Sequence, residues 1–99
     1  MNGPVSGLTP AQDERLTLLI EECAEVIKVA TKIQRFGYNS FHPLGIMSNR
    51  ELLEHELGDV ATARRLLEEA SDVSVVKVEA AAAEKYKTVG SYLNHQGKA

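Results

Sequence analysis

Residues 16–33, LTLLIEECAEVIKVATKI, decide the fold, because their apolar side chains recur every three or four positions. That period places them along one side of an α-helix. Just before this stretch, Thr9 and Gln12 can form a capping box around a proline at the first helical position. Gly37 is a natural end for the helix. The sequence therefore predicts a helix over residues 10–36, about 40 Å long.

Two further helices follow. Ser48 and Glu51 form a second capping box, which predicts a helix over residues 49–70. Ser71-Asp72 offers another cap, and Gly90 is a weak point near the end of the helix after it. The apolar stripe of that helix consists of Val75, Val78, Ala82, Tyr86, Val89 and Leu93. No segment alternates with a period of two, so we expect an all-α helical bundle of about three main helices.

The predicted helical domain spans residues 9–96, between tails at 1–8 and 97–99. A chain of 99 residues buries a limited fraction of its surface, so helices this long need a partner subunit. The net charge of −3 carries no block of like charges, which argues against a nucleic-acid partner. No apolar stretch approaches the roughly 20 residues needed to cross a bilayer.

The lone cysteine, Cys23, fits a reducing compartment, and residues 1–7 lack the pattern of a signal peptide. We therefore expect a cytoplasmic protein. Cys23 falls within the apolar arc of the first helix, which predicts core packing and not a nucleophile.

Four acidic residues occupy the apolar arcs of the first two helices. At about 100° per residue, Glu22 lies inside the first arc and Glu25 at its edge. Glu56 lies near the middle of the second arc, and Asp59 follows one turn later on the same face. Glu21, by contrast, points toward the polar side.

Burying an unpaired carboxylate is costly, and four of them would also repel one another. A cation between the helices removes both problems, and carboxylate oxygens suit Mg²⁺, with Mn²⁺ as a substitute. The plainer interpretation is that the acids pair with basic residues across an oligomer seam. Arg15 and Arg64 fall on or near the two arcs and are the candidates for that pairing.

The acids also form a known pattern. EECAE at residues 21–25, followed by ELGD at residues 56–59, resembles the EExxE…ExxD signature of the MazG-like, all-α nucleoside triphosphate pyrophosphohydrolases. The resemblance covers about residues 16–67. It implies a bundle completed by a homodimer or homotetramer, and metal-dependent cleavage of (deoxy)nucleoside triphosphates to the monophosphate and pyrophosphate, as in nucleotide-pool house-cleaning. It also implies metal binding by Glu22, Glu25, Glu56 and Asp59, and it matches Glu21 to a catalytic position.

Basic and aromatic residues supply candidates for the rest of a nucleotide site. The lysines that can contact phosphates are Lys28, Lys32, Lys85 and Lys87. Lysines on helices more often lie on a solvated face, and Lys28 is also placed for an ion pair with Glu25. Tyr38, Phe41 and His42 can stack on a base, or can simply fasten their loop to the core.

Two other functions compete with this one. A non-enzymatic helical interaction or regulatory module would use the acids in salt bridges, and metal would change nothing. A carboxylate-bridged di-iron bundle would require Glu-x-x-His pairs. None of the histidines, His42, His55 and His95, has a Glu three residues before it.

Overall fold

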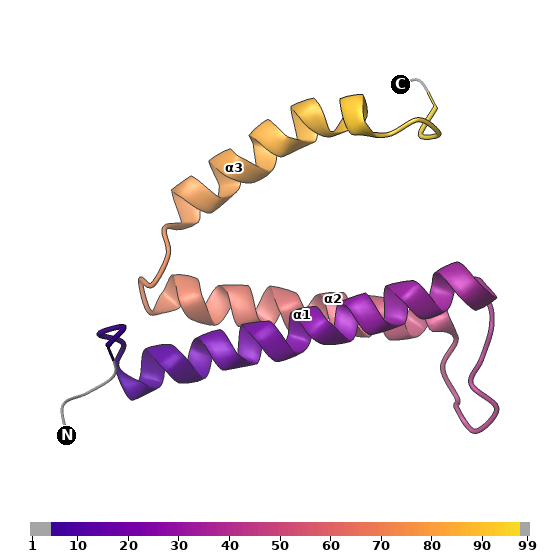
Figure 1. The fold of residues 1–99 in the computed structure, drawn as a ribbon, viewed down its shortest axis with the longest axis horizontal. Helices are drawn as coiled ribbons and strands as arrows, with labels where there is room; N and C mark the ends of the chain where they lie inside the picture. Colours follow the sequence, from indigo (N-terminus) through magenta and orange to yellow (C-terminus); the bar gives the residue numbers. More distant parts are fainter. Residues whose placement is uncertain (1–4, 98–99) are drawn as a thin grey trace.

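The computed structural model describes residues 5–97, which form α-helices joined by loops (Figure 1). The elements in chain order are α1 (Pro10–Phe36), α2 (Asn49–Glu69), α3 (Val75–Thr88) and a short 3₁₀ helix, η1 (Val89–Tyr92). The described residues contain no β-strand, and their one antiparallel bridge joins Phe41 to Ser48. The predicted all-α class is confirmed.

Helices α1 and α2 pack side by side as an antiparallel hairpin (Figure 1). Both predicted capping boxes are present, at Thr9 for α1 and at Ser48 for α2. Gly37 ends α1 at a φ of 87°, and its N–H donates to the carbonyl of Ile33 at 2.7 Å. The residues that the hairpin buries are Val29, Ala63, Leu67 and Asn49.

The loop between α1 and α2 is fastened to the start of α2. The backbone N–H of Asn49 donates to the carbonyl of Ser40, and that of Arg50 donates to the carbonyl of Tyr38, both at 2.9 Å. The Arg50 guanidinium also stacks over the Tyr38 ring, 5.0 Å from its centroid. Tyr38 therefore fastens the loop, which is the plainer of its two predicted roles.

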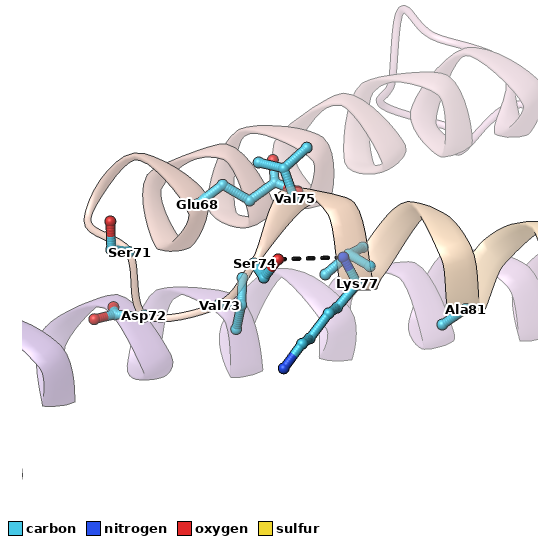
Figure 2. Close-up of a pocket in the computed structure, with 9 residues that line it drawn as sticks. Glu68, Ser71, Asp72, Val73, Ser74, Val75, Lys77 and Ala81 are labelled. Carbon is cyan, nitrogen blue, oxygen red and sulfur yellow. Dashed lines mark hydrogen bonds between the residues drawn. The ribbon is translucent and has the colours of Figure 1, made fainter.

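The connection between α2 and α3 differs from its prediction. Ser71 adopts a φ of 61°, and its N–H closes the end of α2 on the carbonyl of Glu68. The cap of α3 is Ser74, whose hydroxyl accepts from the N–H of Lys77 (Figure 2). The predicted cap at Ser71-Asp72 is wrong, because these residues make the turn before the helix. The predicted third helix also ends early, since the chain tightens into η1 after Thr88 and leaves Leu93 outside.

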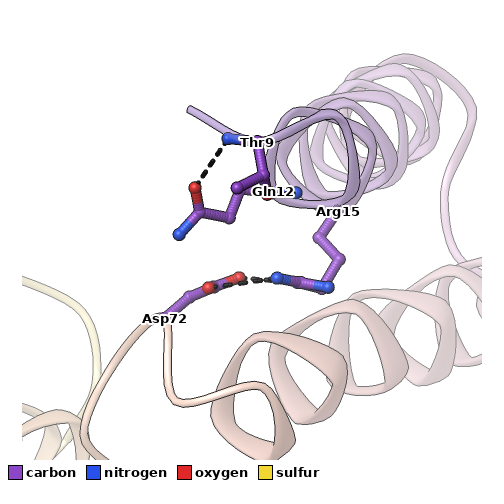
Figure 3. Close-up of polar contacts among 4 residues, drawn as sticks. All are labelled: Thr9, Gln12, Arg15 and Asp72. Carbon is purple, nitrogen blue, oxygen red and sulfur yellow. Dashed lines mark hydrogen bonds and ion pairs between the residues drawn. The ribbon is translucent and has the colours of Figure 1, made fainter. Parts of the chain in front are cut away.

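Two arginines tie this connection to the hairpin. Arg15 on α1 donates twice to Asp72, from Nε to Oδ2 at 2.6 Å and from Nη2 to Oδ1 at 3.2 Å (Figure 3). Arg64 on α2 contacts both Glu68 and Glu79, the latter in the second turn of α3. Arg15 therefore links α1 to the turn before α3, and Arg64 links α2 to the first part of α3.

Beyond this connection α3 diverges from the hairpin, so the chain is not a closed three-helix bundle (Figure 1). Its radius of gyration is 17.3 Å, whereas a compact chain of this length has about 13 Å. It exposes 8154 Å², about 2,600 Å² more than a compact monomer of its mass.

Cys23 is exposed, so its predicted packing in the core of the chain is wrong, because that side of α1 is not covered. None of the described helices is both long and apolar enough to cross a membrane.

Candidate metal centre

Three of the four predicted metal ligands meet between α1 and α2. One carboxylate oxygen each from Glu22, Glu56 and Asp59 lies within 4.8 Å of the other two. Glu22 comes from α1, while Glu56 and Asp59 come from α2 one turn apart. All three side chains are partly buried.

The helical repeat explains why these acids meet. Glu22 lies two turns before the buried Val29, and Glu56 lies two turns before the buried Ala63. Residues seven apart share a helix face, so both glutamates lie on the faces through which α1 and α2 pack. On these faces the two glutamates interrupt a pattern that continues to the buried, apolar Val29 and Ala63.

The acids perturb one another. Partial burial is the largest cause that raises the pKa of the Glu22 carboxyl above its ordinary value. The charge of Asp59, a hydrogen bond with Asp59, and the charges of Glu56 and Glu25 raise the pKa further. Burial and mutual repulsion both disfavour the carboxylate form, and a cation between the helices would reverse that preference.

Basic side chains do not neutralise this cluster within residues 5–97. The two arginines proposed for that role are engaged elsewhere, Arg15 with Asp72 and Arg64 with Glu68 and Glu79. Among residues 5–97, the ion-pair contact that a basic group makes with these acids is that of His55, whose Nε2 lies 3.7 Å from Oδ2 of Asp59 at an exposed position. Pairing of these acids across an oligomer seam stays a prediction, because it involves residues of a second copy.

The donor set suits a hard divalent cation. Three carboxylates from two rigid helices offer oxygen ligands only, as Mg²⁺ and Mn²⁺ prefer. Mg²⁺ sites usually hold the metal through a few carboxylates and leave the remaining positions to waters or substrate phosphates. Glu22, Glu56 and Asp59 thus have the composition and spacing to hold a metal ion.

The other predicted site residues lie outside the three-acid cluster. Glu25 is exposed one turn after Glu22, close enough for its charge to raise the pKa of Glu22. Glu21 and Lys28 are exposed on α1. Lys85 lies on the diverging α3, where its ammonium stacks over the Tyr92 ring 4.9 Å from the centroid. Neither Lys85 nor the exposed Lys87 is brought to the acids of its own chain.

Lys32 has a different environment. It lines a hollow of about 430 Å³ together with Phe36, Phe41, His42 and Asn49. The sequence marks Phe41 and His42 as residues that either stack on a base or fasten their loop, whereas it does not mark Phe36 and Asn49 as site residues. In the sequence, Asn49 stands out only as the residue that follows a helix cap. The spacing of apolar residues gives no indication that it is buried.

A larger hollow lies elsewhere. It measures about 810 Å³ and opens in the angle between α2 and α3, beside Glu68, Val75 and Lys77 (Figure 2). It contains none of the predicted metal ligands, and Glu68 on its wall is already paired with Arg64. We therefore place the candidate site at the three acids and not in this larger hollow.

Comparison with protein-family models, with curated proteins and with solved structures gives no match to this chain. What is established is thus a class: a three-helix, all-α chain with an acidic cluster that can hold a metal ion.

Proposed function

We propose that this protein is a metal-dependent nucleoside triphosphate pyrophosphohydrolase of the MazG-like kind. The observation that carries the proposal is the approach of Glu22, Glu56 and Asp59 within 4.8 Å across two helices. These three acids are the positions that the EExxE…ExxD resemblance assigns to metal. Glu25, the fourth acid of the pattern, lies at the edge of the cluster and is the additional ligand that we propose.

A triphosphate is strongly anionic, and bare carboxylates would repel it. A Mg²⁺ ion held by the acids would offset that charge and lower the pKa of a coordinated water. The residues of the chain position this chemistry, because Glu22 and Glu56 project from rigid helices and not from a loop. A nearby carboxylate that does not coordinate the metal would accept the proton released by the attacking water.

The proposed reaction is a hydrolysis at the α-phosphorus. A water oxygen forms a new bond to that phosphorus, and the bond from the α-phosphorus to the oxygen bridging to the β-phosphorus breaks. Pyrophosphate leaves with the electron pair of that bond, and the nucleoside monophosphate retains the water oxygen. Lys28 and Lys32 are the proposed contacts for the phosphates, since both lie on the same helix as Glu22 and Glu25.

We also propose that the protein acts as a homo-oligomer, with a second copy on the outer stripe of α1, which we define as Leu16, Ile20, Cys23 and Ile27. Their spacings of four, three and four place them on one side of the helix, and all are exposed. The surface of the chain in excess of a compact monomer, about 2,600 Å², lies at the upper end of the roughly 1,000–2,500 Å² that each partner of an obligate homodimer buries. Cys23 and Glu25 are separated by about 200° around the helix, so a partner on this stripe leaves the side of Glu25 open.

The test is pyrophosphate release from a panel of canonical and modified NTPs and dNTPs, with Mg²⁺ or with EDTA. Glu22→Gln and Glu56→Gln are the test variants, and Glu54→Gln is the matched control, because Glu54 is exposed on α2 outside the cluster. We expect Mg²⁺-dependent release that both test variants lose and the control retains. An inactive panel, together with a melting temperature indifferent to Mg²⁺ and Mn²⁺, would favour the non-enzymatic interaction module instead.

A further inference from the structure

The hollow at the loop end of the hairpin has the size and lining of a ligand pocket. Its volume of about 430 Å³ falls within the range of about 300–1,000 Å³ typical of small-molecule sites. Two phenylalanines and a histidine supply flat surfaces, Phe36 from α1 and Phe41 and His42 from the loop. Lys32 adds a positive charge at its wall. The pocket thus suits a flat ring attached to an anionic group.

The pocket lies along the hairpin from the three acids, toward the loop. Glu25, Lys32 and Phe36 follow one another at spacings of seven and four, so they lie on the same side of α1. At 1.5 Å per residue, Lys32 lies about 10 Å along the helix from Glu25. Asn49 lies the same distance from Glu56 along α2. A nucleotide with its phosphates at the acids can therefore extend its base toward the pocket.

Asn49 gives the pocket a specific polar requirement. Its side chain is 1% exposed, and its Nδ2 donates to the carbonyl of Gly37 at 3.0 Å. That bond fixes the orientation of the amide, which leaves Oδ1 as the remaining acceptor. Oδ1 is buried and has no hydrogen-bond partner among residues 5–97. Buried acceptors are rarely left unpaired, so this oxygen points to a donor that a ligand supplies.

We propose that this pocket binds the base of the nucleotide and that Asn49 selects a base with an amino group at C4 of a pyrimidine or C6 of a purine, which means cytosine or adenine. The assignment of the ligand as a nucleotide rests on the proposed function. Uracil, thymine and hypoxanthine carry a carbonyl oxygen where cytosine and adenine carry the amino group, and that oxygen would oppose Oδ1. Because Oδ1 is covered in the structure, a side chain of the pocket wall must shift on binding. Phe41, 54% exposed on the loop, is the side chain that we expect to move.

The experiment is an NMR titration of the ¹⁵N-labelled full chain with free nucleosides in EDTA, so that neither phosphate nor metal contributes. Deoxycytidine is compared with deoxyuridine, and adenosine with inosine, because each pair differs at the amino group. We expect the amino-bearing member to bind at least about tenfold more tightly and to shift the side-chain amide signals of Asn49. Phe41→Ala should weaken this binding, and Tyr86→Ala, an exposed aromatic on α3, should not.

Equal affinities within each pair would overturn the selection by Asn49. Absence of binding by all four nucleosides would overturn the pocket itself, even if the protein releases pyrophosphate from triphosphates. Selective nucleoside binding without pyrophosphate release would support the pocket and count against the hydrolysis. The two proposals therefore fail in different ways.

Discussion

At the scale of single residues, the structure places like charges where a helix pair normally buries apolar side chains. Glu22 and Glu56 occupy the packing faces of α1 and α2, and the pKa of Glu22 is raised by burial and by its acidic neighbours. Such a cluster lowers the stability of the folded chain at neutral pH, because ionising the Glu22 carboxyl beside other acids is unfavourable. Functional centres commonly lower the stability of the folded protein in this way.

Removing one of these charges should stabilise the metal-free protein. We expect Glu22→Gln to raise the melting temperature in EDTA, because the variant removes repulsion with Asp59 and Glu56. With Mg²⁺ at a hundred times its dissociation constant, we expect the melting temperature of wild-type protein to rise by about 10 °C or more. We expect Glu22→Gln to show no such rise. Differential scanning calorimetry measures both effects, with Glu54→Gln as the control. A melting temperature of wild-type protein that Mg²⁺ leaves unchanged would contradict the site.

The pair of Arg15 and Asp72 should give the fold a dependence on acid pH. The hydrogen bond from Arg15 holds the pKa of Asp72 below its ordinary value. A lowered pKa in the folded state means that the pair stabilises the fold above the ordinary aspartate range and loses this effect as pH falls through the lowered pKa. We expect Asp72→Asn to melt below wild type at neutral pH, with a difference that shrinks in strongly acidic solution. A difference that is constant across this range would exclude the charge pair as its cause.

At the scale of elements, the hairpin was predictable and the third helix was only partly so. The caps at Thr9 and Ser48 and the three-four apolar period define α1 and α2 by local interactions, which a sequence displays directly. The turn at Ser71 was not predictable, because it depends on a positive φ and on the distant Arg15. In the site, the residue spacing predicted Glu22, Glu56 and Asp59, whereas the burial of Asn49 depends on how the loop folds back.

The cap of α2 should contribute measurably to the stability of the element that carries two of the three acids. Ser48 accepts from the N–H of Glu51, and the Glu51 side chain accepts from the N–H of Ser48. We expect Ser48→Ala to lower the free energy of unfolding by about 1 kcal/mol. Urea denaturation followed by circular dichroism measures the loss. Thr62→Ala is the control, because its hydroxyl bonds back to Gly58 within α2 and caps nothing; an equal loss in both variants would argue against a capping effect.

At the scale of the whole molecule, the structure leaves more surface uncovered than a stable monomer of this size. Ile20 and Ile27 are 67% and 64% exposed on the outer stripe of α1, and α3 packs on neither hairpin helix along most of its length. An isolated helix of 14 residues is marginal in water. Arg64 and Glu79 hold the start of α3 in its outward orientation, so a second copy, and not α3 of the same chain, is the proposed cover.

The outer stripe should therefore control assembly. We expect Ile20→Glu combined with Ile27→Glu to convert an oligomer into a 10.8 kDa monomer, as measured by light scattering after size-exclusion chromatography. The control is Ile46→Glu, because Ile46 is 91% exposed but lies in the loop. In wild-type protein the Cys23 thiol should react slowly with an alkylating reagent, and rapidly in the double variant. A wild-type monomer, or an oligomer that the double variant leaves intact, would refute the interface.

The most direct test of the central claim, a metal centre that cleaves nucleoside triphosphates, is ³¹P NMR of a nucleotide panel incubated with the protein and Mg²⁺. We expect at least one triphosphate to give signals of its monophosphate and of pyrophosphate in equal amounts, with no change in EDTA or with Glu56→Gln. Triphosphates that remain intact throughout, or that yield diphosphate and inorganic phosphate, would contradict the account.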